Sequence, residues 1–411
     1  MKIKSNYLFD CEIGIEKESL RVDENGRFAQ TDHPFLGNPN IDRDFCENQV
    51  EIITNPVLSA KAAYNEIKRI HRYVLKELNK RGEYLWLFSN PPYFENDDEI
   101  KIAHFTDELA YREDYRRYLA DRYGKRKMLY SGIHYNFSFG RKYVEDLFTK
   151  SGETDFRVFK DRLYLELAGK TVAYSWFIVY LTAASPVFDR SFFTENADYH
   201  LERYASARCS EIGYHNDFIP ILDYSDIKHY IDSIKSYIDN RDIITESELY
   251  YPVRLKPKGA NSIDNLSENG VNHIELRMID LNPLSDAGIF EKDIAFLHML
   301  MIYLLSLDDF DFTKYAQKAA IKKMYTAALY NAPGIKDEAL SLLSDMKDFF
   351  TERKNAGYEG VIDYQIDKLT IPDNRYATII RKRFGDDFMR KGLDLSKEQS
   401  SQLSTRGRIL T

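Results

Sequence analysis

The sequence has only three cysteines in 411 residues, Cys11, Cys46 and Cys209, which is an odd number without any C-x-x-C spacing. That pattern excludes a disulfide framework and a cysteine zinc site and is typical of a reduced, cytoplasmic protein. The N-terminal stretch MKIKSNYLFD lacks an apolar core of signal-peptide length, so we do not expect secretion. The longest apolar run, 172–184, is too short for a bilayer and contains polar residues, so it predicts a buried helix and no membrane partner.

An excess of basic residues is also lacking, because 57 Lys and Arg stand against 65 Asp and Glu, for a formal net charge of -8. Phosphate backbones are met by basic surfaces, so nucleic acid is not an expected partner. There is no glycine-rich loop of the P-loop or dinucleotide kind, so a bound nucleotide would depend on metals and side chains. The 30 Tyr and 25 Phe are numerous and suit pockets for small polar molecules.

The hydrophobic pattern predicts strands spread among helices. Alternation predicts strands over 11–22, 49–53, 84–88, 131–139 and 273–279. Spacing of 3.6 residues predicts helices over 59–80, 106–123, 156–184, 226–237, 289–305, 312–329, 336–350 and 374–395. Repeats and long linkers are absent, which indicates one α+β unit with a mostly antiparallel sheet backed by helices. We expect a single catalytic domain over 1–411, with the sheet in about 1–285 and helices in about 286–411.

Charged groups recur on one face of several predicted strands. In CEIGIEKESLRV, residues 11–22, alternation places Glu16 and Glu18 side by side. Two like charges there raise the energy of the fold unless a cation lies between them, although a solvated strand face is the alternative. In HIELRMIDLNP, alternation places His273, Glu275, Arg277 and Ile279 on one face. The complete set is Glu16, Glu18, Glu51, His134, Glu275 and Arg277, with Asp44 just ahead of the second strand.

If these faces line one cavity, the carboxylates need several divalent cations to offset their repulsion. Oxygen ligands with one imidazole fit Mg²⁺ or Mn²⁺ better than zinc, and such ions are commonly completed by substrate phosphates. Arg277 would then suit a transferring phosphoryl group. In YYPVRLKPKG, Arg254, Lys256 and Lys258 are the nearest basic candidates for phosphate contact, with a solvated loop as the alternative.

Six ordered blocks now carry a resemblance. GIEKESLRV, DFCENQVEIIT, RYGKRKMLYSGIHYNFSF, YASARCSEIGY, ESELYYPVR and HIELRMIDLNP resemble the bacterial glutamate-cysteine ligase family, also called γ-glutamylcysteine synthetase, over about residues 10 to 285. The resemblance implies a glutamine-synthetase-like catalytic fold whose curved sheet carries the active site. It also implies an enzyme that uses ATP and two or three Mg²⁺ ions to phosphorylate the γ-carboxylate of glutamate. Cysteine then attacks the acyl phosphate to give γ-glutamylcysteine, ADP and phosphate.

By motif position, the resemblance assigns roles to individual residues. The implied metal ligands are Glu16, Glu18, Asp44, Glu51, His134 and Glu275, and the implied catalytic residues are Arg277 and Glu51. The expected nucleotide-binding residues, Arg254 and Lys256, come from the basic loop described above and not from the motif match. The implied substrate-binding residues are Arg208, Tyr214, Tyr115, Tyr250, Phe45 and Leu119, the last four around the cysteine pocket.

One departure concerns the amine acceptor. Met128 stands where the family commonly has glutamine, and a thioether lacks the donors and acceptors of an amide. A γ-glutamyl ligase for another amine is therefore an alternative to the cysteine enzyme. A catalytically silent binding homologue and a divalent-metal nuclease are further alternatives, but the intact carboxylates disfavour the first and the acidic balance disfavours the second. We expect a single-function protein, because no second ATP-binding domain follows the matched blocks. We also expect a monomer.

Overall fold

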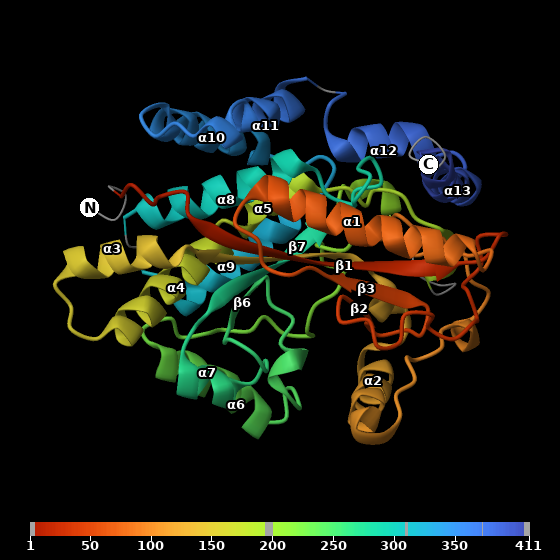
Figure 1. Ribbon diagram of the computed structural model, residues 1–411, viewed down its shortest axis with the longest axis horizontal. Coiled ribbons are helices and arrows are strands. Elements are labelled where there is room, and N and C mark those ends of the chain that lie inside the picture. The colour runs from red at the N-terminus through yellow and green to blue at the C-terminus, as the bar shows by residue number, and fades with distance from the viewer. Residues whose placement is uncertain (1–4, 194–199, 309–310, 372, 407–411) are drawn as a thin grey trace.

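A sheet of seven strands runs through the middle of the computed structural model, in the order β2-β3-β1-β5-β7-β6 with β4 paired to β1 (Figure 1). The structure describes residues 5–193, 200–308, 311–371 and 373–406. The six strand pairs are antiparallel. The strands are β1 (Cys11–Val22), β2 (Ile41–Arg43), β3 (Gln49–Ile53), β4 (Tyr84–Leu85), β5 (Gly132–Phe139), β6 (Val253–Lys256) and β7 (His273–Asp280).

Helices cover the apolar face of this sheet. α1 lies on β1 and β3, and α4 and α5 lie on β6 and β7. In Figure 1, α10 to α13 form the far edge of this helical side, while α2, α6 and α7 project on the other side. The helices are α1 (Ala60–Asn79), α2 (Ala110–Tyr123), α3 (Arg141–Ser151), α4 (Phe156–Ala173), α5 (Ser175–Thr182), α6 (Ile227–Asp239), α7 (Ile263–Asn269), α8 (Glu291–Ser306), α9 (Lys314–Ala327), α10 (Ile335–Thr351), α11 (Val361–Thr370), α12 (Tyr376–Phe384) and α13 (Phe388–Arg406).

Local chemistry explains where several of these elements begin and end. α1 starts where Ser59 accepts a hydrogen bond from the Ala62 amide, as its position ahead of an amphipathic stretch predicts. α2 stops at Gly124, which takes a positive φ of 81°. These caps confirm the predicted helix boundaries at 59–80 and at the end of 106–123. The α+β class with a mostly antiparallel sheet, expected from the sequence, is likewise the class of the observed fold.

The strand register brings the charged residues to one face, because residues paired across strands point the same way. Glu18 pairs with Glu51 on β3, and Glu16 pairs with His134 on β5. On the other side of β5, Asn136 pairs with Glu275 on β7. The opposite face of the same strands carries core residues. The central core residues of β1 and β5 are Ile13, Ile15, Ile133, Tyr135 and Phe137.

A β-bulge in β7 contradicts the strict alternation expected there. Ile133 pairs with Ile279, but two residues further along β5, Tyr135 pairs with Leu276, three residues away on β7. The extra residue turns Ile279 to the core face, so the prediction that it shares the face of Glu275 is wrong. The bulge also pairs Asp280 with Gly132 at the start of β5.

Three other predictions differ from the structure in length. The helix predicted over 156–184 is two helices, α4 and α5, separated at Tyr174. The helix predicted over 374–395 is two helices, α12 and α13, because the chain turns at Gly385, whose amide bonds the Arg381 carbonyl. A Cβ at that glycine would lie 2.6 Å from the same carbonyl oxygen. The strand predicted over 84–88 is limited to the two residues of β4. Among the described residues, no helix is long and apolar enough to span a membrane.

Candidate functional site

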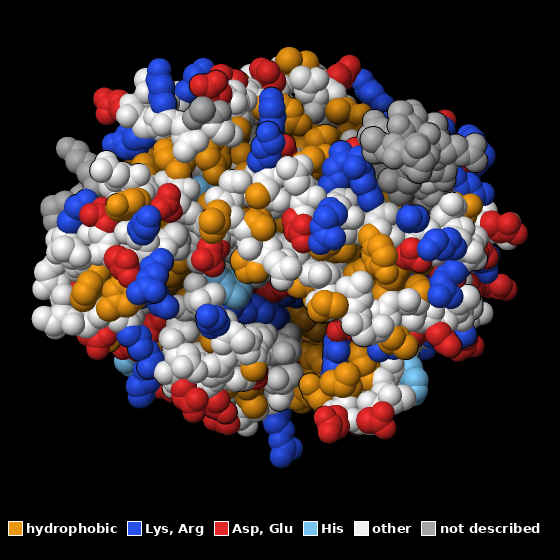
Figure 2. Space-filling model, viewed as in Figure 1, with side chains coloured by type: hydrophobic (Ala, Val, Ile, Leu, Met, Phe, Trp, Pro, Cys, Tyr) orange, Lys and Arg blue, Asp and Glu red, His pale blue; other side chains and the backbone are white. Residues whose placement is uncertain are grey.

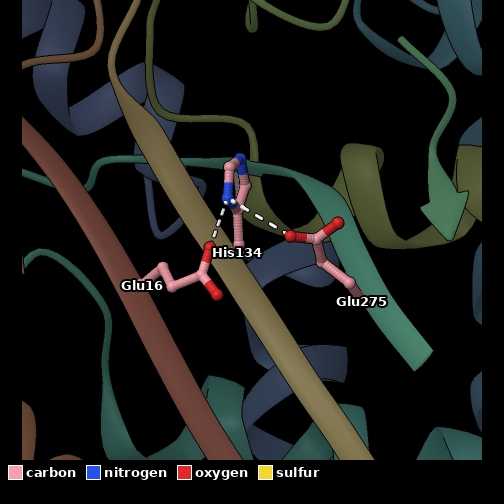
Figure 3. Close-up of side chains that lie close together, drawn as sticks. All are labelled: Glu16, His134 and Glu275. Carbon is pink, nitrogen blue, oxygen red and sulfur yellow. Dashed lines mark hydrogen bonds and ion pairs between the residues drawn. The ribbon is translucent and has the colours of Figure 1, made fainter. Parts of the chain in front are cut away.

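His134 lies at the centre of the charged face, between two carboxylates from neighbouring strands. Its Nδ1 is 3.0 Å from Glu16 Oε2 and 3.8 Å from Glu275 Oε1 (Figure 3). The other oxygen of Glu16 accepts a hydrogen bond of 3.0 Å from Asn136 Nδ2. Strand β1 supplies Glu16, β5 supplies His134 and Asn136, and β7 supplies Glu275, so the sheet itself fixes their separation.

Glu18 and Glu51 form a second group on the other side of the same imidazole. His134 Nε2 is 3.6 Å from Glu18 Oε1, and the second Glu18 oxygen accepts a 2.9 Å hydrogen bond from the Gly132 amide. The ligand atoms of Glu18, Glu51 and His134 lie within 4.8 Å of one another, as do those of Glu16, His134 and Glu275. One imidazole is therefore shared by two clusters of carboxylate oxygens.

Burial and neighbouring charges shift the pKa values of these carboxyl groups in opposite directions. Burial and then the charges of neighbouring carboxylates, Asp44 first, raise the pKa of Glu51 well above its usual range. The pKa of Glu18 is raised for the same two reasons. Burial also acts to raise the pKa of Glu275, but Lys256 and the other nearby cations hold it well below its usual range. Without a cation between them, the carboxylates near Asp44 are thus costly to ionise.

This donor set fits a hard divalent cation. Carboxylate oxygens with a single imidazole nitrogen are the ligands of Mg²⁺ and Mn²⁺ sites, and thiolates are absent from both clusters. A divalent ion would lower the cost of ionising Glu18 and Glu51 directly, because it supplies the missing opposite charge. Asp44 lies in the same cavity but outside the two clusters of described residues.

Basic side chains border the carboxylates on the β6 and β7 side. Arg277 Nη1 is 3.2 Å from Glu275 Oε2, and Lys256 Nζ is 3.3 Å from the same oxygen. Burial opposes the charge of Arg277, but Glu275 outweighs it and the pKa of the guanidinium is raised. Arg254 donates hydrogen bonds to the carbonyls of Leu249 and Ser247, so part of its guanidinium holds the loop ahead of β6.

Arg208 reaches the site across the first residue of β5. Its Nη1 donates to the carbonyl oxygens of Arg277 at 2.8 Å and Ile279 at 3.3 Å, at the bulge of β7. A Cβ at position 132 would lie 2.2 Å from the Arg208 Cζ atom, so this crossing requires Gly132. The motif resemblance was the signal that selected Arg208, because its loop shows no periodicity.

The carboxylates, His134 and the basic side chains described above line one cavity of about 470 Å³. Figure 2 shows the surface hollowed between the region of α6 and α7 and the region of α2, with basic and hydrophobic side chains at the base. α2 contributes Tyr115 and Leu119 to one wall, next to Met128. The residues nominated by the sequence that line the cavity are Glu16, Glu18, Asp44, Phe45, Glu51, Tyr115, Leu119, Met128, His134, Arg208, Tyr214, Tyr250, Arg254, Lys256, Glu275 and Arg277.

Lys258 is not among the residues that line the cavity. The other lining residues were not nominated by the sequence analysis, and they are Asp42, Ile53, Arg112, Arg116, Tyr130, Ser247 and Asn261. Arg112 pairs with Asp42 at 2.7 Å, and the Arg116 guanidinium donates to the carbonyls of Asp44 and Arg43. These contacts attach α2 to β2. A charged helix outside a recognised block gave no sign of this role.

The three cysteines are buried and carry no disulfide. Burial raises the pKa of all three thiols, which keeps them in the unreactive thiol form. Burial therefore disfavours redox sensitivity at Cys46 and Cys209, which adjoin Phe45 and Arg208 in the chain.

Comparisons with known proteins agree on one family. The family model described as glutamate-cysteine ligase matches residues 1–244 and 238–326. The glutathione biosynthesis bifunctional protein GshAB of Clostridium perfringens is 33% identical over 413 residues, which cover 93% of this chain and 52% of that protein. The chain therefore spans about half the length of the curated relatives that it matches. The expectation of a single-function protein stays a prediction.

Two solved structures share the fold. The bifunctional glutathione synthetase of Pasteurella multocida has a TM-score of 0.87 and 25% identity, over 97% of this chain and 53% of that one. A glutamate-cysteine ligase of Francisella tularensis, solved in complex with AMP, has a TM-score of 0.87 and 24% identity, over 96% of this chain and 89% of that one.

Proposed function

Because the chain belongs to the glutamate-cysteine ligase family, we propose that it joins the γ-carboxylate of L-glutamate to the amine of L-cysteine at the expense of ATP. The products are γ-glutamylcysteine, ADP and phosphate, the first step of glutathione biosynthesis. The observation that carries the proposal is the single cavity in which carboxylates from β1, β3 and β7 meet His134 beside Arg277 and Lys256. A carboxylate-rich site bordered by fixed cations suits phosphoryl transfer from a metal-bound nucleotide.

The proposed metal ligands are Glu16, Glu18, Asp44, Glu51, His134 and Glu275. Two or three Mg²⁺ ions, with Mn²⁺ as an alternative, would supply the positive charge that neutralises the phosphate oxygens of ATP. The chain's own contribution is to hold these ligands on rigid strands, at separations set by the pairing of β1 with β3 and β5. Asn136 orients Glu16 through its 3.0 Å hydrogen bond.

In the first step, a γ-carboxylate oxygen of glutamate attacks the γ-phosphorus of ATP, the bond from that phosphorus to the bridging oxygen breaks, and ADP leaves. Arg277, held by Glu275 at 3.2 Å, is a fixed cation placed to stabilise the transferring phosphoryl group. Lys256 and Arg254 are the proposed contacts of the nucleotide phosphates. Glu51, which pairs with Glu18 in the register, is the second proposed catalytic residue.

In the second step, the amine nitrogen of cysteine attacks the acyl carbon and loses a proton, and phosphate leaves with the electrons of the C–O bond. Arg208 is the proposed partner of a substrate carboxylate. The rings of Tyr214 and Tyr250 lie 4.1 Å apart and, with the α2 wall, are proposed to form the acceptor pocket. The proposed pocket residues are Phe45, Tyr115, Leu119, Tyr214 and Tyr250. Such a wall excludes water, which would otherwise hydrolyse the acyl phosphate.

A ligase for a different amine is the second candidate, because Met128 lies in the same wall with only 3% of its surface exposed. A buried thioether gives the acceptor no hydrogen-bond donor at that point. Product formation with cysteine, 2-aminobutyrate and alanine separates the two candidates. Equal ADP release with all three amines would contradict the cysteine assignment.

The test of the proposed function is Mg²⁺-dependent ADP release together with amide formation. We expect Arg277→Ala to lower the rate about 10²- to 10³-fold, as loss of a transition-state donor does, and Glu51→Gln to impair turnover as well. Arg141→Ala, at a side chain that is 87% exposed, is the control with full activity. Unchanged turnover in both site variants would contradict the assigned roles, and no Mg²⁺-dependent ADP release from the wild type would favour the silent homologue.

We further propose that residues 1–411 act as one ligase domain and that the enzyme is a cytoplasmic monomer without nucleic-acid or membrane partners. The described hydrophobic residues form one large cluster that extends from β1 to α13, which supports one domain. Sedimentation velocity of the purified chain tests the monomer, because a dimer would sediment with about twice the mass.

A further inference from the structure

We propose that Asn216 is a positioning residue that sets the width of the amine-acceptor pocket by fixing Tyr250 to helix α2. This inference rests on the proposed ligase function. Asn216 was not singled out by the sequence and does not line the cavity itself. Only 2% of the residue is exposed, and it lies in the loop that carries Tyr214, behind the tyrosine wall.

The Asn216 amide joins three segments that are distant in the chain. Its oxygen accepts a 2.8 Å hydrogen bond from the backbone amide of Tyr250. Its nitrogen donates to the Glu248 carbonyl at 2.9 Å and to the Tyr123 hydroxyl at 3.1 Å, at the end of α2. The amide therefore bonds both the segment of Tyr250 and the end of α2, so the side chain fixes the distance between these two elements.

Glu248 anchors the other end of this connection. Its carboxylate is fully buried, at 0% exposure, and Oε1 accepts hydrogen bonds from the hydroxyls of Tyr123 at 2.7 Å and Tyr118 at 3.3 Å. Arg122 Nη1 lies 3.2 Å from the same oxygen, and Oε2 accepts from the Ile244 amide at 2.8 Å. A buried charge with so many partners is costly to move, so α2 is held firmly at this point.

The connection acts on the acceptor pocket through one stripe of α2. Tyr115, Leu119 and Tyr123 follow one another at four-residue spacing and therefore share one face of the helix. The first two line the cavity, and the third holds the Asn216 amide. The Tyr123 and Tyr250 rings also meet edge to face at 5.6 Å. Glu248 still holds α2 when the Asn216 amide is lost, but the Tyr250 backbone loses its hydrogen bond to that amide. Tyr250 can then move away from the α2 wall, while the carboxylates on the sheet stay in place.

The experiment compares variants that remove different parts of this connection. Asn216→Ala removes the whole amide, and Tyr123→Phe removes only the hydroxyl that bonds both Asn216 and Glu248. Tyr118→Phe is the matched control. It removes a hydroxyl of the same helix that bonds the Glu248 carboxylate but does not bond Asn216. Steady-state kinetics with glutamate, cysteine and ATP are measured for each, together with the ratio of ADP released to amide formed.

We expect Asn216→Ala to raise the KM for cysteine about tenfold, in line with the loss of a buried hydrogen-bonding group, and to leave the KM values for glutamate and ATP within about twofold. The ADP-to-amide ratio should rise above that of the wild type, because a looser wall admits water. Tyr123→Phe should change the same two quantities in the same direction, and Tyr118→Phe should match the wild type.

A uniform fall in kcat with an unchanged KM for cysteine would overturn the positioning role and indicate a general loss of stability. Equal effects of Tyr118→Phe and Tyr123→Phe would overturn it as well. If Asn216→Ala does not fold, Tyr123→Phe decides, since the ring remains. A wild-type protein that forms no amide overturns the proposed function and this role with it, whereas wild-type activity with an unaltered acceptor KM in the variants overturns the positioning role alone.

Discussion

Lys17 lies between Glu16 and Glu18 on β1, but its side chain points to the opposite face, into the core beneath α1. Only 1% of its surface is exposed, and its Nζ lies 2.8 Å from His71 Nδ1. No carboxylate is paired with it in the part of the chain that the structure describes. Burial lowers the pKa of Lys17 to about 7 and holds the pKa of His71 well below its usual range.

This burial makes stability depend on pH in a definite direction. Between about 7 and the ordinary value of 10.5, the unfolded chain binds a proton at Lys17 that the folded chain does not, so the free energy of unfolding rises with pH in this window. Below about 7 the penalty for the buried ammonium is fully present. We expect Lys17→Met to raise Tm at pH 6.5 and to flatten its rise toward pH 9, as measured by thermal denaturation at several pH values. A variant with the same slope as the wild type would contradict the assigned pKa.

Residue-scale chemistry also shows what local pattern can and cannot identify. The carboxylates of β1 were identifiable from alternation, because a side chain's face depends only on its own strand. Arg116 gave no comparable signal, since its importance comes from a contact with the backbone of Asp44.

Helix α11 joins the C-terminal helices to the core through a buried ion pair. Lys368 Nζ is 3.0 Å from Asp293 Oδ1 on α8 and donates to the Leu181 carbonyl at 2.8 Å. The second oxygen of Asp293 accepts from the Tyr376 hydroxyl on α12 at 2.7 Å. Burial lowers the pKa of Lys368, although the facing carboxylate opposes the shift. Three helices therefore meet at one carboxylate.

We expect Lys368→Met to lower the free energy of unfolding by about 3–5 kcal/mol, because it leaves Asp293 buried without its cation. An exposed ion pair of α11 supplies the control. Lys347 on α10 pairs with Asp363 on α11 at 2.7 Å, and both side chains are more than half exposed. Lys347→Met should change stability by about 0–1 kcal/mol. Urea denaturation of both variants measures the difference, and similar values for the two would contradict a structural role for the buried pair.

At the scale of the whole molecule, the described apolar residues of the sheet and of the C-terminal helices form one core. The two tryptophans report on separate parts of it. Trp86 follows β4 and meets Phe388 of α13 at 5.2 Å, whereas Trp176 begins α5 and lies under Lys323 of α9 at 4.1 Å. Both indoles are almost completely buried, at 0% and 2% exposure.

If residues 1–411 are one domain, both tryptophans should report the same unfolding transition. We expect Trp86→Phe and Trp176→Phe, each of which leaves one fluorescent reporter, to unfold at midpoints that coincide with the loss of circular dichroism measured on the same variant. If the fluorescence midpoint of one variant differed from its circular dichroism midpoint, the single domain would be contradicted. A domain boundary would then lie between the sheet and the helices.

By itself, the sequence determined that β1 and β5 carry polar groups on one face and apolar groups on the other, and that α1 begins after Ser59. These features are local, because alternation, helical spacing and caps depend on residues that are near one another in the chain. Ordered motif blocks added the family and most of the candidate site.

Only the tertiary structure decided that these faces share one cavity, because strand register depends on pairs that are far apart in the chain. It also decided the bulge that turns Ile279 to the core, the passage of Arg208 over Gly132, and the attachment of α2 through Asn216. Each depends on a contact between elements that the sequence separates by tens of residues, so no local pattern could show it.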